Sequence, residues 1–186
     1  MELYHYYERS IGPFRMITEL PMDAAKALLL QKSAEGKFHH PNIDGFLARR
    51  YDHDRRLREA FIKRGGKPTR TAPIYMMLGA HPQWESAYDE AAVIKIPLDA
   101  FARAHVSFTY GDSFAVFDPI LYRDKEYGQR VYFADEILAL IERLGMPKHV
   151  DYDFKRGIYP TDMPINHHLK YVEAQVWDDT VIDRYR

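Results

Sequence analysis

The sequence predicts an α+β fold in which helices pack around a split, mainly antiparallel β-sheet. Helical patterns gather in the first third of the chain and strand patterns mostly follow one another later, which favours an antiparallel over a doubly wound parallel sheet. Of the 186 residues 46% are hydrophobic and 28% are charged, which is typical of a globular protein with one core. We therefore predict a single domain over residues 1–186.

Two long helices and one late helix are expected. Residues 22–32 are rich in Ala and Leu, which are good helix formers. A second helical pattern starts after Asn42 and stops at Gly65, and it lies in a basic insertion of about residues 33–66. The strongest pattern covers residues 134–144 and ends at Gly145. Short helical turns are predicted at residues 82–88, 97–101 and 179–185.

Seven short apolar or alternating runs predict strands, and a polar segment predicts a long loop. The predicted strands cover residues 3–7, 74–78, 92–96, 105–110, 114–117, 130–133 and 171–177. The predicted loop covers residues 148–168.

The composition excludes several kinds of chemistry. The chain has no cysteine, which rules out thiolate catalysis, disulfides and cysteine-based metal sites. The nine histidines show no metal-binding spacing, so we predict no metal site. The first residues lack a signal-peptide pattern, and no apolar run reaches the roughly 20 residues that a membrane span needs. We expect a soluble, cytoplasmic protein without a membrane partner.

One stretch is strongly basic in a chain whose net charge is −1. Residues 46–70 hold nine Lys or Arg against three acidic residues. Such a stretch either contacts the phosphates of a nucleic acid or forms an ordinary solvated helix face. The candidate nucleic-acid-binding residues are Arg49, Arg50, Arg55, Arg56, Arg58, Lys63 and Arg64.

Glu173 is the acidic residue with the most informative surroundings. Strand alternation places it on one face with Tyr171, Gln175 and Trp177. A carboxylate between aromatic side chains indicates the wall of a cleft, and the 14 tyrosines of the chain suit an aromatic groove. The alternative is an edge strand whose polar face lies in solvent.

Five short motifs follow one another along the chain. The N-terminal motifs are Leu3-Tyr4-His5-Tyr6 and Arg70 ahead of Ile74-Tyr75-Met76-Met77. The later motifs are Leu98-Asp99 after a strand, Phe108-Thr109-Tyr110-Gly111-Asp112, and Glu173 in a late strand. Taken in this order, the motifs resemble the ADP-ribosyltransferase superfamily, most nearly the DarT-like toxins that modify nucleic acid. A second register aligns Val131-Tyr132-Phe133 with the Tyr-Phe-Ala strand of poly-ADP-ribose polymerases, whose triad is His-Tyr-Glu.

The resemblance implies an enzyme that uses NAD as its substrate and transfers ADP-ribose to DNA or RNA, or less readily to protein. It implies a toxin or phage-defence effector with an antitoxin protein as a partner. Glu173 would stabilise the oxocarbenium-like transition state, and His5 would hydrogen-bond a ribose. Arg70 would neutralise the pyrophosphate, and Tyr75 or Tyr132 would stack on nicotinamide. Thr109 would complete the NAD site.

Three departures from the family pattern qualify the resemblance, and one of them is the long insertion of residues 33–66. Gly12-Pro13-Phe14 stands where a glycine-marked helix usually follows the first His. Glu173 is followed by Ala174-Gln175, so the second acid of a Glu-x-Glu motif is absent, which argues against arginine-directed protein modification.

Two other functions stay open at the level of sequence. One is a non-catalytic module that binds nucleic acid or protein through the aromatic cleft and the basic helix. The other is a metal-independent hydrolase that uses the histidines and carboxylates. The transferase interpretation requires His5 and Glu173 in one cleft, not on opposite faces of the sheet.

Overall fold

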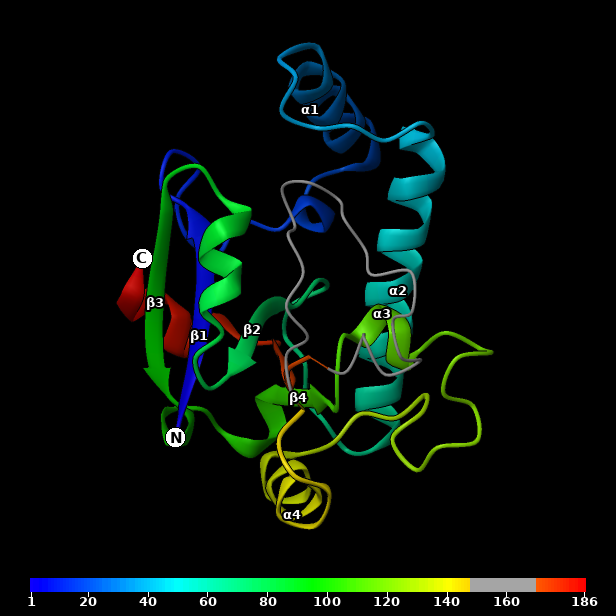
Figure 1. Ribbon diagram of the computed structural model, residues 1–186, viewed down its shortest axis with the longest axis vertical. Helices are drawn as coiled ribbons and strands as arrows, with labels where there is room; N and C mark the ends of the chain where they lie inside the picture. Colours follow the sequence, from blue (N-terminus) through cyan, green and yellow to red (C-terminus); the bar gives the residue numbers. More distant parts are fainter. Residues whose placement is uncertain (148–169) are drawn as a thin grey trace.

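The computed structural model describes residues 1–147 and 170–186 (Figure 1). The predicted loop 148–168 lies outside these residues. The strands are β1 (Glu2–Glu8), β2 (Ile74–Leu78), β3 (Ala91–Pro97), β4 (Val106–Thr109) and β5 (Glu173–Val176). They form one sheet in the order β3-β1-β2-β5-β4, and neighbouring strands are antiparallel. The prediction of an α+β protein with a mainly antiparallel sheet is confirmed.

The helices include three of eleven residues or more. They are α1 (Met22–Ala34), α2 (Ile43–Lys63), α3 (Ser113–Val116), α4 (Ala134–Leu144) and α5 (Asp179–Ile182). Turns of 3-10 helix are η1 (Ile17–Glu19), η2 (Pro82–Ala87), η3 (Leu98–Ala100), η4 (Arg103–His105) and η6 (Asp183–Tyr185).

The sheet opens between β1 and β2. These strands pair only at Leu3 with Leu78 and at Tyr4 with Met77. Further along, β1 stays paired with β3 over all seven of its residues, while β2 pairs with β5. The two halves of the sheet therefore diverge after Tyr4.

Each face of the sheet carries its own apolar cluster. Ile137 and Leu140 of α4 pack with Leu3, Met76 and Ala174 on one face. On the other face, Leu57 and Phe61 of α2 pack against Trp177, with Tyr75 beside them. In Figure 1, α2 stands to the right of the sheet, α1 lies above it and α4 lies below it.

The long helix α2 follows from local sequence. The Asn42 side chain accepts a hydrogen bond from the Gly45 N–H and caps the N-terminus. His53, Leu57 and Phe61, spaced four apart, are all buried against the protein. The basic insertion is thus a helix, as predicted, and one side of it belongs to the core.

Three predicted strands are wrong or too long. Residues 113–116 form α3, because the Asp112 side chain accepts from the Phe114 N–H and caps a helical turn. Residues 130–133 contribute only an isolated bridge between Tyr132 and Phe108. The predicted strand 171–177 is too long, because only β5 (Glu173–Val176) forms a strand within it. Since β5 lies between β2 and β4 in the sheet, the edge-strand alternative for Glu173 is wrong.

None of the helices in the described parts of the chain combines the length and apolar character needed to cross a membrane.

Candidate active site

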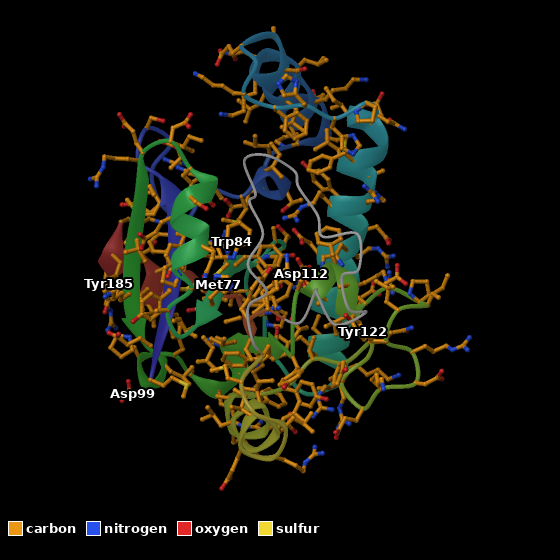
Figure 2. All side chains as sticks on the ribbon, in the orientation of Figure 1. Met77, Trp84, Asp99, Asp112, Tyr122 and Tyr185 are labelled. Carbon is orange, nitrogen blue, oxygen red and sulfur yellow. The ribbon has the colours of Figure 1, made fainter. Side chains whose placement is uncertain are left out.

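An aromatic cleft of about 240 Å³ lies over the opening between β1 and β2. Its lining comes from β1, β2, β5, η2, α2 and the start of α3. It consists of Tyr4, His5, Tyr6, Met16, Arg50, Tyr75, Met77, Trp84, Tyr88, Asp112, Phe114, Tyr171 and Glu173. Figure 2 labels Met77, Trp84 and Asp112, which lie around the middle of the molecule. The tyrosine-lined groove expected from composition is present here.

Glu173 is held by a chain of buried side chains. The Gln175 Nε2 donates to Glu173 Oε1 at 2.9 Å and to Thr109 Oγ1 at 3.2 Å. The Gln175 Oε1 accepts from Ser107 Oγ at 2.7 Å, and Ser107 Oγ accepts from Trp177 Nε1 at 2.9 Å. Because each partner is fixed by the next, the Glu173 carboxyl has one orientation in the cleft.

Burial, and to a smaller extent the nearby charge of Asp112, raise the pKa of Glu173 to about 8. Hydrogen bonds from Ser113 and Gln175 act in the opposite direction, favouring the carboxylate. Glu173 is therefore mostly protonated at neutral pH, beside a second carboxyl group. Two carboxyl groups in different environments are the usual arrangement for acid–base and glycosyl-transfer chemistry.

This pKa gives a testable pH dependence of stability. The folded chain keeps the Glu173 proton up to about pH 8, whereas the unfolded chain loses it near pH 4.5, so stability falls as pH rises through this interval. Burial lowers the pKa of His5 to about 4 and that of His53 to about 3, so both favour folding increasingly as pH rises towards 6.5. We expect the free energy of unfolding to peak near pH 6.5 and to fall by about 1 kcal/mol per pH unit towards pH 8.

Urea unfolding at a series of pH values measures this dependence, with Glu173→Gln as the matched variant. Gln keeps the acceptor for Gln175 but cannot titrate, so the decline between pH 6.5 and 8 should disappear. A decline of equal slope in Glu173→Gln would contradict the assignment to Glu173.

Tyr75 forms a fixed aromatic surface in the cleft. Its hydroxyl donates to the buried Asp54 of α2, which also accepts from Thr18 Oγ1. Burial raises the pKa of Tyr75 well above its usual value, so the hydroxyl stays a donor. The Arg50 guanidinium lies 5.4 Å from the Tyr75 ring centroid and 4.8 Å from that of Phe114. A cation and two rings thus face the cleft together.

His5 lies at the opening of the sheet, but both nitrogens of its ring are hydrogen-bonded to backbone groups of the protein. Its Nε2 accepts from the Phe14 N–H at 2.9 Å, so Nδ1 carries the proton and donates to the Tyr75 carbonyl at 3.0 Å. The ring stacks on Phe14, whose φ of 57° is in the left-handed region. Such strain persists only where the surroundings fix it, and His5 does so here.

His5 and Glu173 line one cleft, yet their side chains leave the sheet on opposite faces. Glu173 pairs with Met77, and Met77 with Tyr4, so these three share a face, whereas His5 follows Tyr4 in the strand. The transferase interpretation requires His5 and Glu173 in one cleft and not on opposite faces of the sheet, so only the first half of that requirement is met. The predicted hydrogen bond from His5 to a ribose needs the Phe14 N–H to give up its partner, so a transferase site here would rest on Glu173 and not on His5. In this structure His5 positions Phe14 and joins β1 to β2.

Arg70 lies away from the cleft. Its guanidinium pairs with Glu19 and Asp179 and donates to the Ala72 carbonyl. Because these partners use its donors and it is buried, Arg70 is not placed to receive a pyrophosphate. Arg50, in contrast, lines the cleft.

Two further predicted residues lie outside the cleft lining. The Tyr132 hydroxyl donates to the Glu126 carbonyl, and its ring belongs to the core on the other side of β4. Thr109 is buried behind Glu173, where it donates to the Gly111 carbonyl and holds Gln175. Of the two candidate tyrosines, only Tyr75 lines the cleft.

A second cavity of about 420 Å³ adjoins the cleft and shares Asp112 and Phe114 with it. His53 lines it, with its ring stacked on Phe114 at 3.9 Å between centroids. The cations of its lining are Arg49 and Arg56, and its carboxylates are Asp52, Asp112 and Asp118. The cavity is therefore mixed in charge and is not a purely basic groove.

Most of the basic stretch is used in internal contacts. Arg55 pairs with Asp52 and Glu59, and Arg64 with Glu136. The remaining contacts are to backbone carbonyls: Arg56 to Phe117, and Arg58 to Pro68 and Arg70. Within residues 1–147 and 170–186, Arg49 and Lys63 are exposed and have no ion pair, so nucleic-acid binding by this stretch stays a prediction centred on them.

Sequence reasoning missed three residues of this region. Asp112 ends a quoted motif but lies in both cavities, and Ser113 follows it at the start of α3. His53 could have been placed in the core by its spacing from Leu57 and Phe61. The part of the chain that the structure describes contains no group of three acidic or histidine side chains able to hold a metal ion.

The comparisons with known proteins leave the family open. No protein-family model matches the chain, and neither a curated protein nor a solved structure matches it significantly.

Proposed function

We propose that the chain is an NAD-dependent ADP-ribosyltransferase-like enzyme with nucleic acid as its preferred acceptor. The observation that supports it most is Glu173, buried between aromatic side chains beside Tyr75 and Arg50, at the opening of an antiparallel sheet. The divergence of β1 and β2 suits the split sheet of that superfamily, whose fold is part of the same proposal.

Glu173 has the central role in the proposed reaction. The bond between nicotinamide and C1′ of the ribose breaks, and nicotinamide leaves with the electron pair. The ionised form of Glu173, which its pKa of about 8 makes the minor form at neutral pH, stabilises the positive charge that develops on the ribose and accepts a hydrogen bond from a ribose hydroxyl. An acceptor nucleophile then forms the new bond to C1′, and its proton passes to Asp112, which lines both cavities.

The residues that line the cleft are assigned the roles in binding NAD. Tyr75 offers its ring to nicotinamide, and Arg50 neutralises the pyrophosphate in the place first assigned to Arg70. Ligand pockets usually enclose about 300–1,000 Å³. At about 240 Å³ the cleft is small for a whole dinucleotide, so the proposal places the nicotinamide ribose end here.

NAD binding tests the assignment of Arg50. Trp84 lies at the cleft, so its fluorescence reports occupancy. We expect NAD to quench it and Arg50→Gln to weaken NAD about tenfold, as the loss of one charge-assisted contact does. Arg184→Gln, an exposed arginine outside both cavities, is the matched control and should bind NAD as the wild type does. Equal weakening by both substitutions would contradict the role of Arg50.

Release of nicotinamide from NAD tests the function itself. The full chain is incubated with NAD, alone and with single-stranded DNA or RNA, and free nicotinamide is measured. We expect nicotinamide to be released, and to be released faster when single-stranded DNA or RNA is present as the acceptor. Binding of nucleic acid without any turnover of NAD would instead favour the non-catalytic module.

A further inference from the structure

We propose that Asp54 is a positioning residue for NAD, because it holds the Tyr75 ring in one orientation in the cleft. Asp54 lies on α2, is 2% exposed and is not itself part of the cleft lining. Its Oδ1 accepts the hydrogen bond of the Tyr75 hydroxyl. The use of this contact in binding NAD rests on the proposed function, whereas the orientation of the ring does not.

Tyr75 lies where its ring can fix the place of a flat ligand. Its partner in β5 is Gln175, and Met77, two residues further along β2, is the partner of Glu173. Side chains two residues apart in a strand share a face, so Tyr75 and Glu173 are diagonal neighbours on the face that lines the cleft. The orientation of the Tyr75 ring therefore sets where a ring stacked on it lies relative to Glu173.

Asp54 is itself held from two sides. While Oδ1 accepts from Tyr75 of β2, Oδ2 accepts from Thr18 Oγ1 of η1. Because each oxygen has its own hydroxyl donor, the carboxylate cannot turn without breaking a hydrogen bond. Burial raises the pKa of Asp54, and the hydrogen bonds from Thr18 and Tyr75 and the charge of Arg50 act in the opposite direction. The Tyr75 hydroxyl thus meets an acceptor that is fixed in place.

Helix α2 supplies two contacts to the same ring. Arg50 and Asp54 are four residues apart, so their side chains lie on one side of the helix. The Arg50 guanidinium carbon lies over the Tyr75 ring, 5.4 Å from its centroid, while Asp54 binds the hydroxyl. The ring is therefore held at one face and at its end, and it has little freedom to rotate.

A ring that is already fixed loses little freedom when a ligand stacks on it. Ordering one mobile side chain on binding reduces affinity by about two- to tenfold. A phenylalanine in place of Tyr75 would keep the aromatic surface but could not bond to Asp54. The hydroxyl of Tyr75 therefore serves to orient the ring, since its partner lies outside the cleft lining.

A double-mutant cycle on NAD binding tests the role of Asp54. Tyr75→Phe and Asp54→Ala each remove the hydrogen bond, and we expect each to weaken NAD binding about two- to tenfold, measured by the fluorescence of Trp84. The double variant should bind NAD no more weakly than the weaker single variant, because both substitutions remove the same contact. Effects that multiply in the double variant, or wild-type affinity in Tyr75→Phe, would overturn the proposal.

Tyr51→Phe is the matched control. Tyr51 also lies on α2, and its hydroxyl donates to the carbonyls of Ile17 and Leu20, away from the cleft lining. This variant should lose stability but bind NAD as the wild type does. Tyr75→Phe should instead raise KM for nicotinamide release and leave kcat unchanged, because the hydrogen bonds of Glu173 are intact. Equal weakening of NAD binding in Tyr51→Phe would assign the effect to a general loosening of the fold and overturn the proposal.

Crystal structures of the wild type and of Asp54→Ala test the positioning without NAD. We expect one orientation of the Tyr75 ring in the wild type, and a turned ring or several orientations in Asp54→Ala. If Asp54→Ala does not fold, Tyr75→Phe removes the same bond from the other side, and its ring is compared instead. A single, unchanged orientation in the variant would overturn the proposal. If the wild type neither binds nor cleaves NAD, the proposed function fails, while the orientation of the ring still decides the role of Asp54.

Discussion

Replacing Glu173 by Gln is expected to slow the release of nicotinamide from NAD by about 10²- to 10³-fold, the usual cost of losing one group that stabilises transition-state charge. Gln has nearly the same shape and can still accept the hydrogen bond from Gln175 Nε2. The variant should therefore fold and bind NAD as the wild type does, so that the loss falls on kcat.

The control for Glu173→Gln is Glu142→Gln, which removes an exposed carboxylate from α4. Its rate should equal that of the wild type. An unchanged rate in Glu173→Gln would remove Glu173 from the reaction, and with it the proposed site.

His5→Ala is expected to destabilise the protein by about 3 kcal/mol. The substitution leaves the Phe14 N–H and the Tyr75 carbonyl without their buried partner, and it removes a ring packed against Phe14. Unfolding in urea measures the loss. His39→Ala, at an exposed histidine, is the control and should change stability by less than about 0.5 kcal/mol.

The same variant distinguishes positioning from direct contact. If His5 positions Phe14 and the two strands, stability and activity fall together, and His5→Asn, which can keep one hydrogen bond, should lose less of each. A His5→Ala protein of wild-type stability that releases no nicotinamide would show that His5 contacts NAD directly.

The sequence predicts a helix or a strand well where residues close together in the chain determine both its type and its ends. The predicted strand 74–78 matches β2, because Pro73 and Gly79 mark the two ends of its apolar run. The predicted helix 134–144 matches α4, because Gly145 ends its apolar pattern. The predicted strand 114–117 is wrong, because its four apolar residues suit a strand or a helix equally well. The Asp112 side chain caps a helical turn there, and the helix α3 forms instead.

The candidate site depends on contacts distant in sequence, which local patterns do not encode. Glu173 and Tyr75 were predicted, and the pairing of β2 with β5 puts them on one face of the sheet, where Glu173 lies opposite Met77 and Tyr75 opposite Gln175. Local sequence does not distinguish the roles of Arg50 and Arg70. In the fold, Arg70 pairs with Glu19 and Asp179, whereas Arg50 lines the cleft. The fixed imidazole of His5 depends on the chain turning back at Phe14, which no pattern in the strand predicts.

Mass spectrometry of an oligonucleotide incubated with the full chain and NAD tests the central claim most directly. The cleft around Glu173 is proposed to move ADP-ribose onto nucleic acid, so single-stranded DNA or RNA should gain one ADP-ribose as nicotinamide appears. The Glu173→Gln chain should give neither product. Intact NAD and unmodified DNA and RNA with the wild-type chain would contradict the account.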